Sequence, residues 1–90
     1  MSRAKVLIVE DDPAMLRGLE DNFALRGYAT ITAVDGRQGL EAALRDRPDL
    51  LVLDIMLPSM NGYEVCRQIR DAGLDMPIID RKSTRLNSSH

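Results

Sequence analysis

The sequence predicts an α/β fold built on a doubly wound parallel sheet. Short, nearly continuous apolar runs alternate along the chain with longer segments in which apolar residues recur at helical spacing. Continuous apolar runs are typical of strands buried on both faces, as in a parallel sheet covered by helices. The order strand, helix, strand, helix, strand, helix, strand favours right-handed crossovers within one sheet. With 90 residues, 44% of them hydrophobic, the chain has room for one small domain.

The first strand is expected over Lys5–Glu10, where aliphatic residues lead directly into acidic ones. Pro13 follows at what would be the first helical position, with Asp12 as the N-cap. Gly27 stands where a glycine commonly ends a helix. The buried side of this helix is predicted from apolar residues at helical spacing, namely Met15, Leu16, Leu19 and Phe23.

The segment Tyr28–Ala33 alternates and carries β-branched residues, which predicts a strand at the edge of the sheet. Asp35 is then expected to cap a second helix, with Gln38 three residues later in a capping-box arrangement. Pro48 would stop that helix. The residues predicted to face the core from it are Leu40, Ala43 and Leu44.

The third strand is expected over Asp49–Asp54, where four aliphatic residues end in a carboxylate. Asn61–Glu64 repeats the capping pattern at the start of a third helix, and Gly73 would end it. Met76–Ile79 begins a fourth strand. The residues predicted to face the core from the third helix are Val65, Cys66 and Ile69, so the single cysteine is expected to be a buried, inert thiol.

The ends of the first and third strands predict a metal site. In the flavodoxin-like strand order these two strands are neighbours at the switch point, which would bring Glu10 and Asp11 beside Asp54. Crowded carboxylates resist ionising together unless a cation neutralises them, and a small set of oxygen ligands suits Mg²⁺. Asp12 is expected to cap the helix, with metal contact as the lesser alternative. Asp54 alone does not decide for a site, since aspartate is also common where a strand ends or a turn is capped.

Three motifs follow one another along the chain, namely Val6–Pro13, Leu50–Pro58 and Met60–Gly62. Each motif alone is weak, but the three together in this order and context are highly specific. Together they resemble the CheY-like receiver domain of response regulators in two-component signalling. The resemblance runs from about Lys5 to Ile79.

The resemblance implies a role for each matching residue. Asp54 corresponds to the phosphoacceptor, which takes a phosphoryl group from a sensor histidine kinase and contributes to the Mg²⁺ site. Asp11 corresponds to the direct Mg²⁺ ligand, Glu10 to the acid that holds the metal through water, and the main-chain carbonyl of Met56 to the remaining protein ligand. The family is not an enzyme class, since its members only assist their own phosphorylation and dephosphorylation.

The residues disfavour two other functions and leave one alternative open. A phosphatase of the haloacid dehalogenase kind needs a second Asp two residues after the first, where this chain has Met56. A nucleotide-binding enzyme is disfavoured because no glycine-rich loop follows the first strand. The main alternative is a protein-interaction module of the same fold that works without phosphorylation.

After Ile79 the sequence departs from the family pattern. Residues 80–90 are polar and aperiodic, and they resemble, codon for codon, the in-frame translation of a common short-read sequencing adapter. The expectation is therefore that 1–79 is the N-terminal part of a receiver domain and 80–90 a non-native tail. The fold would then be incomplete, lacking the last strand and the last two helices, and not competent as a switch. A genuine short polar tail is the rival explanation.

Composition limits the partners. A formal net charge of -2 gives no basic surface for nucleic acid or for an anionic membrane. No apolar run approaches the length of a membrane span, and the segment after Met1 is too short for a signal peptide. The expected location is the cytoplasm, and the sequence leaves the oligomeric state and any output domain open.

Overall fold

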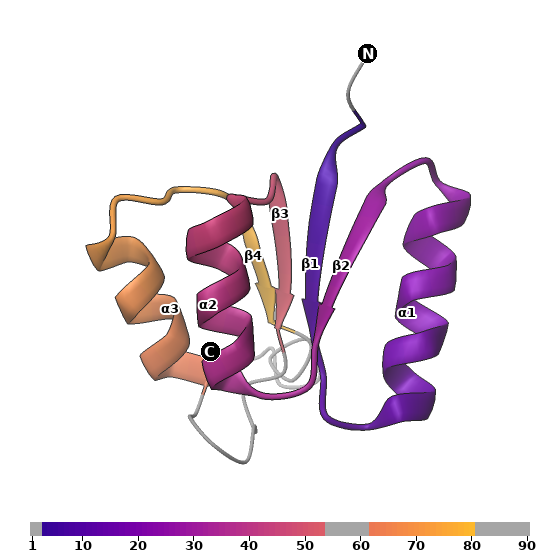
Figure 1. Ribbon diagram of the computed structural model, residues 1–90, viewed down its shortest axis with the longest axis horizontal. Helices are drawn as coiled ribbons and strands as arrows, with labels where there is room; N and C mark the ends of the chain where they lie inside the picture. The colour runs from indigo at the N-terminus through magenta and orange to yellow at the C-terminus, as the bar shows by residue number, and fades with distance from the viewer. Residues whose placement is uncertain (1–2, 54–61, 81–90) are drawn as a thin grey trace, which may run out of the picture.

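A computed structural model describes residues 3–53 and 62–80 of the chain (Figure 1). Within these ranges the strands pair in parallel in the order β2-β1-β3-β4. This order confirms the predicted parallel sheet, the adjacency of the first and third strands, and the edge position of the second. The elements are β1 (Lys5–Val9), α1 (Pro13–Leu25), β2 (Ala29–Ala33), α2 (Gly36–Asp46), β3 (Leu50–Leu53), α3 (Gly62–Asp71) and β4 (Ile78–Asp80).

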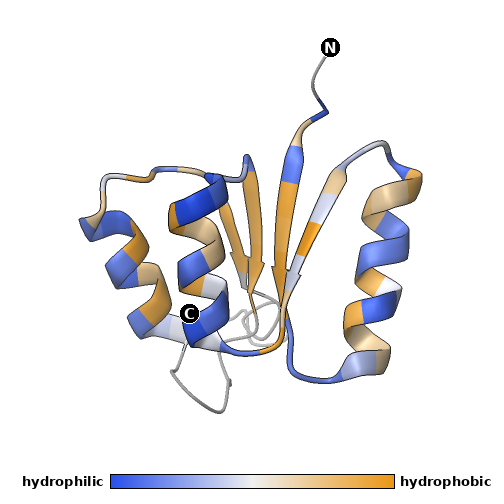
Figure 2. Ribbon diagram, viewed as in Figure 1, coloured by the Kyte–Doolittle hydropathy of each residue, from blue (hydrophilic) through white to orange (hydrophobic). Residues whose placement is uncertain are grey.

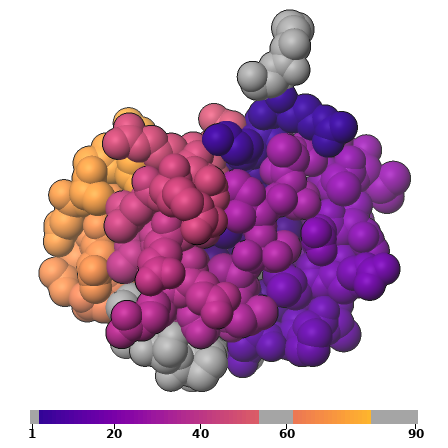
Figure 3. Space-filling view, viewed as in Figure 1, coloured from indigo at the N-terminus to yellow at the C-terminus, as the bar shows by residue number. Residues whose placement is uncertain are grey.

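The sheet has one layer of helices on each face. Helices α2 and α3 pack on one face and α1 on the other, so that α3 and α1 lie at opposite sides of the molecule with α2 between them in the view of Figures 1 and 3. The central strands are almost uniformly apolar, whereas each helix is part apolar and part polar (Figure 2). This difference reflects burial on both faces for strands and on one face for helices. In the described part of the chain, no helix is long and apolar enough to cross a membrane.

The larger core lies between the sheet and the α2–α3 layer. The residues of β1 and β3 that point to that side are completely or almost completely buried, and they meet apolar residues of both helices. Its principal members are Leu7, Val9, Leu51, Leu53, Ala43, Val65 and Ile69.

The core on the α1 side is smaller. It consists of Val6, Ile8 and Val52, against which partly buried residues of α1 and its surroundings pack. No residue of α1 is fully buried. Consistent with this thinner cover, a hollow of about 370 Å³ lies on that side, lined by Asn22, Phe23, Arg26, Tyr28, Leu50 and Ile79.

The predicted helix boundaries are confirmed where the structure describes them. The Asp12 side chain accepts a hydrogen bond from the backbone N–H of Ala14 at 3.0 Å, and that of Asp35 accepts one from the N–H of Gln38 at 2.8 Å. Gly27 and Gly73 follow α1 and α3 with φ angles of 94° and 88°. These conformations favour glycine because it has no Cβ.

Four expectations about burial and boundaries are wrong. Met15 and Leu44, predicted to face the core, are 42% and 44% exposed. Each lies at the margin of its helix's apolar stripe, and small residues bring α2 close to the sheet while leaving Leu44 outside the contact. The fourth strand begins at Ile78 rather than Met76, because Pro77 has no N–H to donate to a ladder. Cys66 is half-buried and packs against the core rather than lying fully within it.

Candidate acidic site at the carboxyl edge of the sheet

Glu10 is a buried carboxylate at the carboxyl end of β1. Its backbone N–H donates to the carbonyl oxygen of Ala33 at 3.0 Å, so the pairing with β2 continues one residue past the strand. The Glu10 residue is only 3% exposed and is the one buried charged residue in the described ranges. A buried carboxylate needs hydrogen-bond donors to replace water, and the N–H of Asp12 donates to Glu10 Oε2 at 3.2 Å. This contact helps to fix Glu10 at the sheet edge.

Asp11 and Asp12 differ from Glu10 in that both are exposed. The Asp12 carboxylate is engaged as the N-cap of α1, which confirms the capping role predicted for it. Asp11 lies between the buried Glu10 and this cap, and its exposed carboxylate is accessible from solvent. One fixed, buried acid and one exposed acid therefore stand next to each other at this edge.

The register of the central strands places the end of β3 beside this acidic pair. Val9, the last residue of β1, pairs with Ala33 on one side and with Leu53, the last residue of β3, on the other. The predicted site residues Asp54 and Met56 lie outside the described residues. Among the residues that are described, no group of three or more His, Cys, Asp or Glu side chains is close enough to hold a metal ion. The structure thus brings two of the predicted ligands to the predicted edge.

The chemistry of these donors fits Mg²⁺. Both offer only carboxylate oxygens, which hard cations prefer, and Mg²⁺ typically takes one or two carboxylates and keeps several waters. A buried acid at such a site is suited to contact through water or through one oxygen, since its other oxygen already accepts a hydrogen bond from the backbone. Asp11 is exposed, so its carboxylate is suited to direct contact with the metal ion.

Gly39 is a residue of this edge that sequence analysis missed. It lies in the first turns of α2, and a Cβ placed on it would be 2.7 Å from Cγ2 and 3.0 Å from Cγ1 of Val9. Val9 directly precedes the acidic pair. A glycine inside a helix is unfavourable by about 1 kcal/mol relative to alanine, so its presence on the buried face could have pointed to a close approach.

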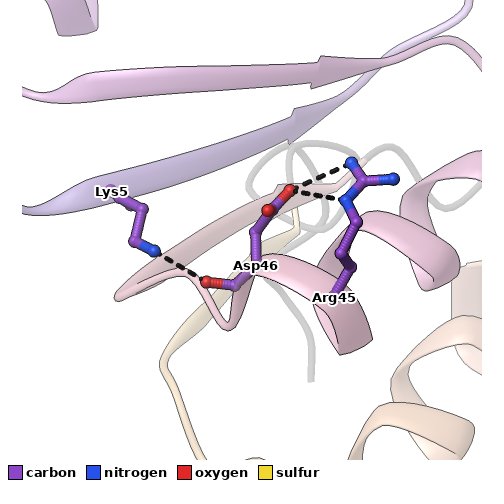
Figure 4. A network of polar contacts seen from close by, with 3 residues as sticks. All are labelled: Lys5, Arg45 and Asp46. Carbon is purple, nitrogen blue, oxygen red and sulfur yellow. Dashed lines mark hydrogen bonds and ion pairs between the residues drawn. The ribbon is translucent and has the colours of Figure 1, made fainter.

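The opposite, amino edge of the sheet carries a separate polar network (Figure 4). Lys5 Nζ donates to the carbonyl oxygen of Asp46 at 2.9 Å, and the backbone N–H of Lys5 donates to Asp49 Oδ2 at 2.7 Å. The Asp46 carboxylate accepts from Arg45 at 3.0 Å, a hydrogen bond that raises the pKa of the Arg45 guanidinium. These contacts tie the end of α2 and the start of β3 to β1, and they are structural.

The fold and the acidic edge together define a class of protein: a doubly wound α/β domain with carboxylates at the switch point, where such domains bind their ligands. Comparison with known proteins identifies the family. Residues 6–80 match the family described as "Response regulator receiver domain". The chain belongs to this family, which confirms the resemblance predicted from the three motifs.

The relatives agree in sequence and in structure. Response regulator MprA of Mycobacterium leprae is 47% identical over 75 residues, which are 83% of this chain and 33% of that protein. MprA of Mycobacterium ulcerans is 45% identical over the same length. The chemotaxis response regulator CheY4 of Vibrio cholerae superimposes with a TM-score of 0.84 at 31% identity, covering 88% of this chain and 68% of that one. This chain spans about a third of the length of the curated relatives it matches.

Proposed function

We propose that Asp54 accepts a phosphoryl group from a sensor histidine kinase, with Mg²⁺ held by Glu10, Asp11, Asp54 and the main-chain carbonyl of Met56. Membership of the receiver family supports the phosphoacceptor role. The observation that carries the proposal for this chain is the acidic end of β1. The buried, hydrogen-bonded Glu10 and the exposed Asp11 follow Val9, which pairs with the last residue of β3, directly before Asp54 in sequence.

The transfer is a substitution at phosphorus. A carboxylate oxygen of Asp54 forms a bond to phosphorus while the bond from phosphorus to the kinase imidazole nitrogen breaks, and that nitrogen keeps the electron pair. When bound, Mg²⁺ offsets the charge between the attacking carboxylate and the phosphoryl oxygens. Glu10 and Asp11 would hold and orient the ion at the sheet edge. The chain acts as acceptor in a relay, and beyond assisting its own phosphorylation and dephosphorylation we assign it no enzymatic activity.

Phosphorylation would change the charge of an edge that is already acidic. A phosphoryl group adds negative charge and strong hydrogen-bond acceptors, which can bias a surface between two arrangements. The cytoplasm, where a histidine kinase presents its phosphorylated domain, is the location consistent with this role. Any output domain and its target lie outside the matched segment.

The tail forms a separate part of the proposal. The family match ends at residue 80, close to Ile79, where the sequence departs from the receiver pattern. We propose that residues 80–90 are non-native. Sequencing the source DNA in one long read across the Ile79 codon tests this. A continuation into further receiver sequence is expected, whereas a genuine reading frame through His90 would refute it.

The phosphoacceptor proposal is tested with a small-molecule phosphodonor. Incubation with acetyl phosphate and Mg²⁺ should give an adduct that is stable to acid and labile to base, detected as the mass of one phosphoryl group. Asp54→Asn should abolish the adduct. In Asp11→Asn, the yield of the adduct should no longer respond to added Mg²⁺. Asp12→Asn is the matched control, because asparagine caps a helix as well as aspartate does. A folded protein that forms no adduct would favour the phosphorylation-independent interaction module.

A further inference from the structure

Helix α2 touches β1 at the residue before the acidic pair. Gly39 has no side chain, and a Cβ there would come within 2.7 Å of a Val9 methyl carbon, closer than such contacts occur. Val9 is a β-branched residue that is 1% exposed, so neither rotation nor displacement is available to it at low cost. The absence of a side chain at position 39 is therefore required for α2 to lie where it does.

The end of β1 is held from both sides within the sheet. Val9 pairs with Ala33 of β2 and with Leu53 of β3, and the N–H of Glu10 donates to the carbonyl oxygen of Ala33. Because lateral movement would break these pairings, a side chain added at position 39 would be accommodated by moving α2 or by tilting the end of β1. Tilting would move Glu10 and Asp11.

We propose that Gly39 is a positioning residue for the metal site: the lack of a side chain there sets the geometry of Glu10 and Asp11, and hence the affinity of the acidic edge for a divalent cation. The inference rests on the proposed Mg²⁺ site. It predicts that added volume at position 39 weakens cation binding beyond what the loss of stability explains.

A residue one turn further along the same helix supplies the control. Ala43 is also completely buried against the sheet. Helix α2 starts at the carboxyl edge, after β2, and ends at the amino edge, where the carbonyl oxygen of Asp46 accepts from Lys5. Ala43 thus packs on the same core but further from the acidic pair. Ala43→Val therefore crowds this core one helical turn away from Gly39.

The experiment measures Mn²⁺ binding by the loss of the sharp electron paramagnetic resonance signal of the free ion, with Mg²⁺ as competitor. This readout suits a chain that has no tryptophan. The chain is compared with Gly39→Ala, Gly39→Val, Ala43→Val and Asp11→Asn, each with its thermal melt. Perturbed support of metal ligands typically weakens binding by 10- to 100-fold, so Gly39→Val is expected to lose roughly tenfold in affinity. Gly39→Ala should fall between it and the unchanged chain.

Two results would overturn the inference: unchanged affinity in both Gly39 variants, or an equal loss in Ala43→Val at a similar melting temperature. If Gly39→Val does not fold, the comparison of Gly39→Ala with Ala43→Val decides. A failure of the proposed Mg²⁺ site can be told apart from a failure of the role of Gly39. If the Mg²⁺ site itself is wrong, the unsubstituted chain would bind no more Mn²⁺ than Asp11→Asn does.

Discussion

The backbone N–H of Asp12 donates a hydrogen bond to Oε2 of Glu10 over 3.2 Å, across the turn that leads from β1 into α1. The Asp12 side chain meanwhile accepts from the N–H of Ala14. One residue thus caps the helix with its side chain and fixes the buried acid with its backbone. Helix start and acidic edge are consequently parts of the same local structure.

Substituting Asp12 tests the cap alone, because the backbone N–H that holds Glu10 is retained in every variant. Asp12→Ala removes the cap and is expected to lower the free energy of unfolding by about 1 kcal/mol, whereas Asp12→Asn, which retains a capping oxygen, should cost only a few tenths. Urea unfolding followed by circular dichroism measures both. Equal losses in the two variants would mean that the charge of Asp12, and not its cap, stabilises this turn.

Substituting Gly18 with alanine should stabilise the fold, in contrast to Asp12→Ala. Gly18 is exposed within α1, and a Cβ placed there would meet nothing within 4 Å. Gly18→Ala is therefore expected to raise the free energy of unfolding by about 0.5–1 kcal/mol through helix propensity. Gly27→Ala is the contrasting variant, since φ is 94° at Gly27 and alanine would be strained. We expect Gly27→Ala to be destabilising. A gain in stability would contradict the left-handed backbone conformation of Gly27 at the end of α1.

Arg47 is a non-glycine residue in the left-handed conformation, with φ of 47°, at the end of α2. Glycine adopts this conformation without steric cost, so Arg47→Gly should stabilise the fold by roughly 0.5–1 kcal/mol. The same change at the exposed helical residue Glu41 should destabilise it by about 1 kcal/mol. A thermal melt of each variant measures the change in stability. If both variants are less stable, the contribution of the Arg47 side chain outweighs the strain of its backbone.

Glu64 on α3 should titrate below the ordinary value of 4.5. The hydrogen bond from Gln68, at 3.1 Å, is the main cause, and a second hydrogen bond from Arg67 adds to it. Because the folded pKa is lowered, the stabilisation is present above the ordinary value and is lost as the pH falls through the lowered one. Carboxyl carbon chemical shifts followed against pH measure this. Gln68→Ala should move the pKa back upward, and no movement would reject the assigned cause.

The sequence predicted the strand order because alternating apolar runs and helices leave few parallel topologies. Residues that act locally were also predictable. Asp12 and Asp35 cap the helices expected of them, since a cap depends on a few neighbouring residues. These features also place Glu10 and Asp11 at the correct edge.

Features that depend on how closely elements approach were not predictable. Met15 and Leu44 sit at the margins of helical apolar stripes, and only the packed position of each helix decides which margin is covered. Gly39 shows the same limit: a glycine on the buried face of a helix points to a close approach, but which strand residue it meets follows from the packed position of α2. Asp54 and Met56 lie outside the described residues, so their roles stay predictions.

Localising the adduct on the chain decides whether Asp54 carries the phosphoryl group. An aspartyl phosphate is reduced by borohydride to homoserine, so treatment after reaction with acetyl phosphate and Mg²⁺, followed by peptide mass spectrometry, marks the acceptor. We predict homoserine at position 54, and no reduced side chain at Glu10, Asp11 or Asp12. Homoserine at position 11 or 12, the corresponding five-carbon alcohol at position 10, or an unmodified peptide at 54 in a protein that carries the adduct, would show that Asp54 is not the acceptor.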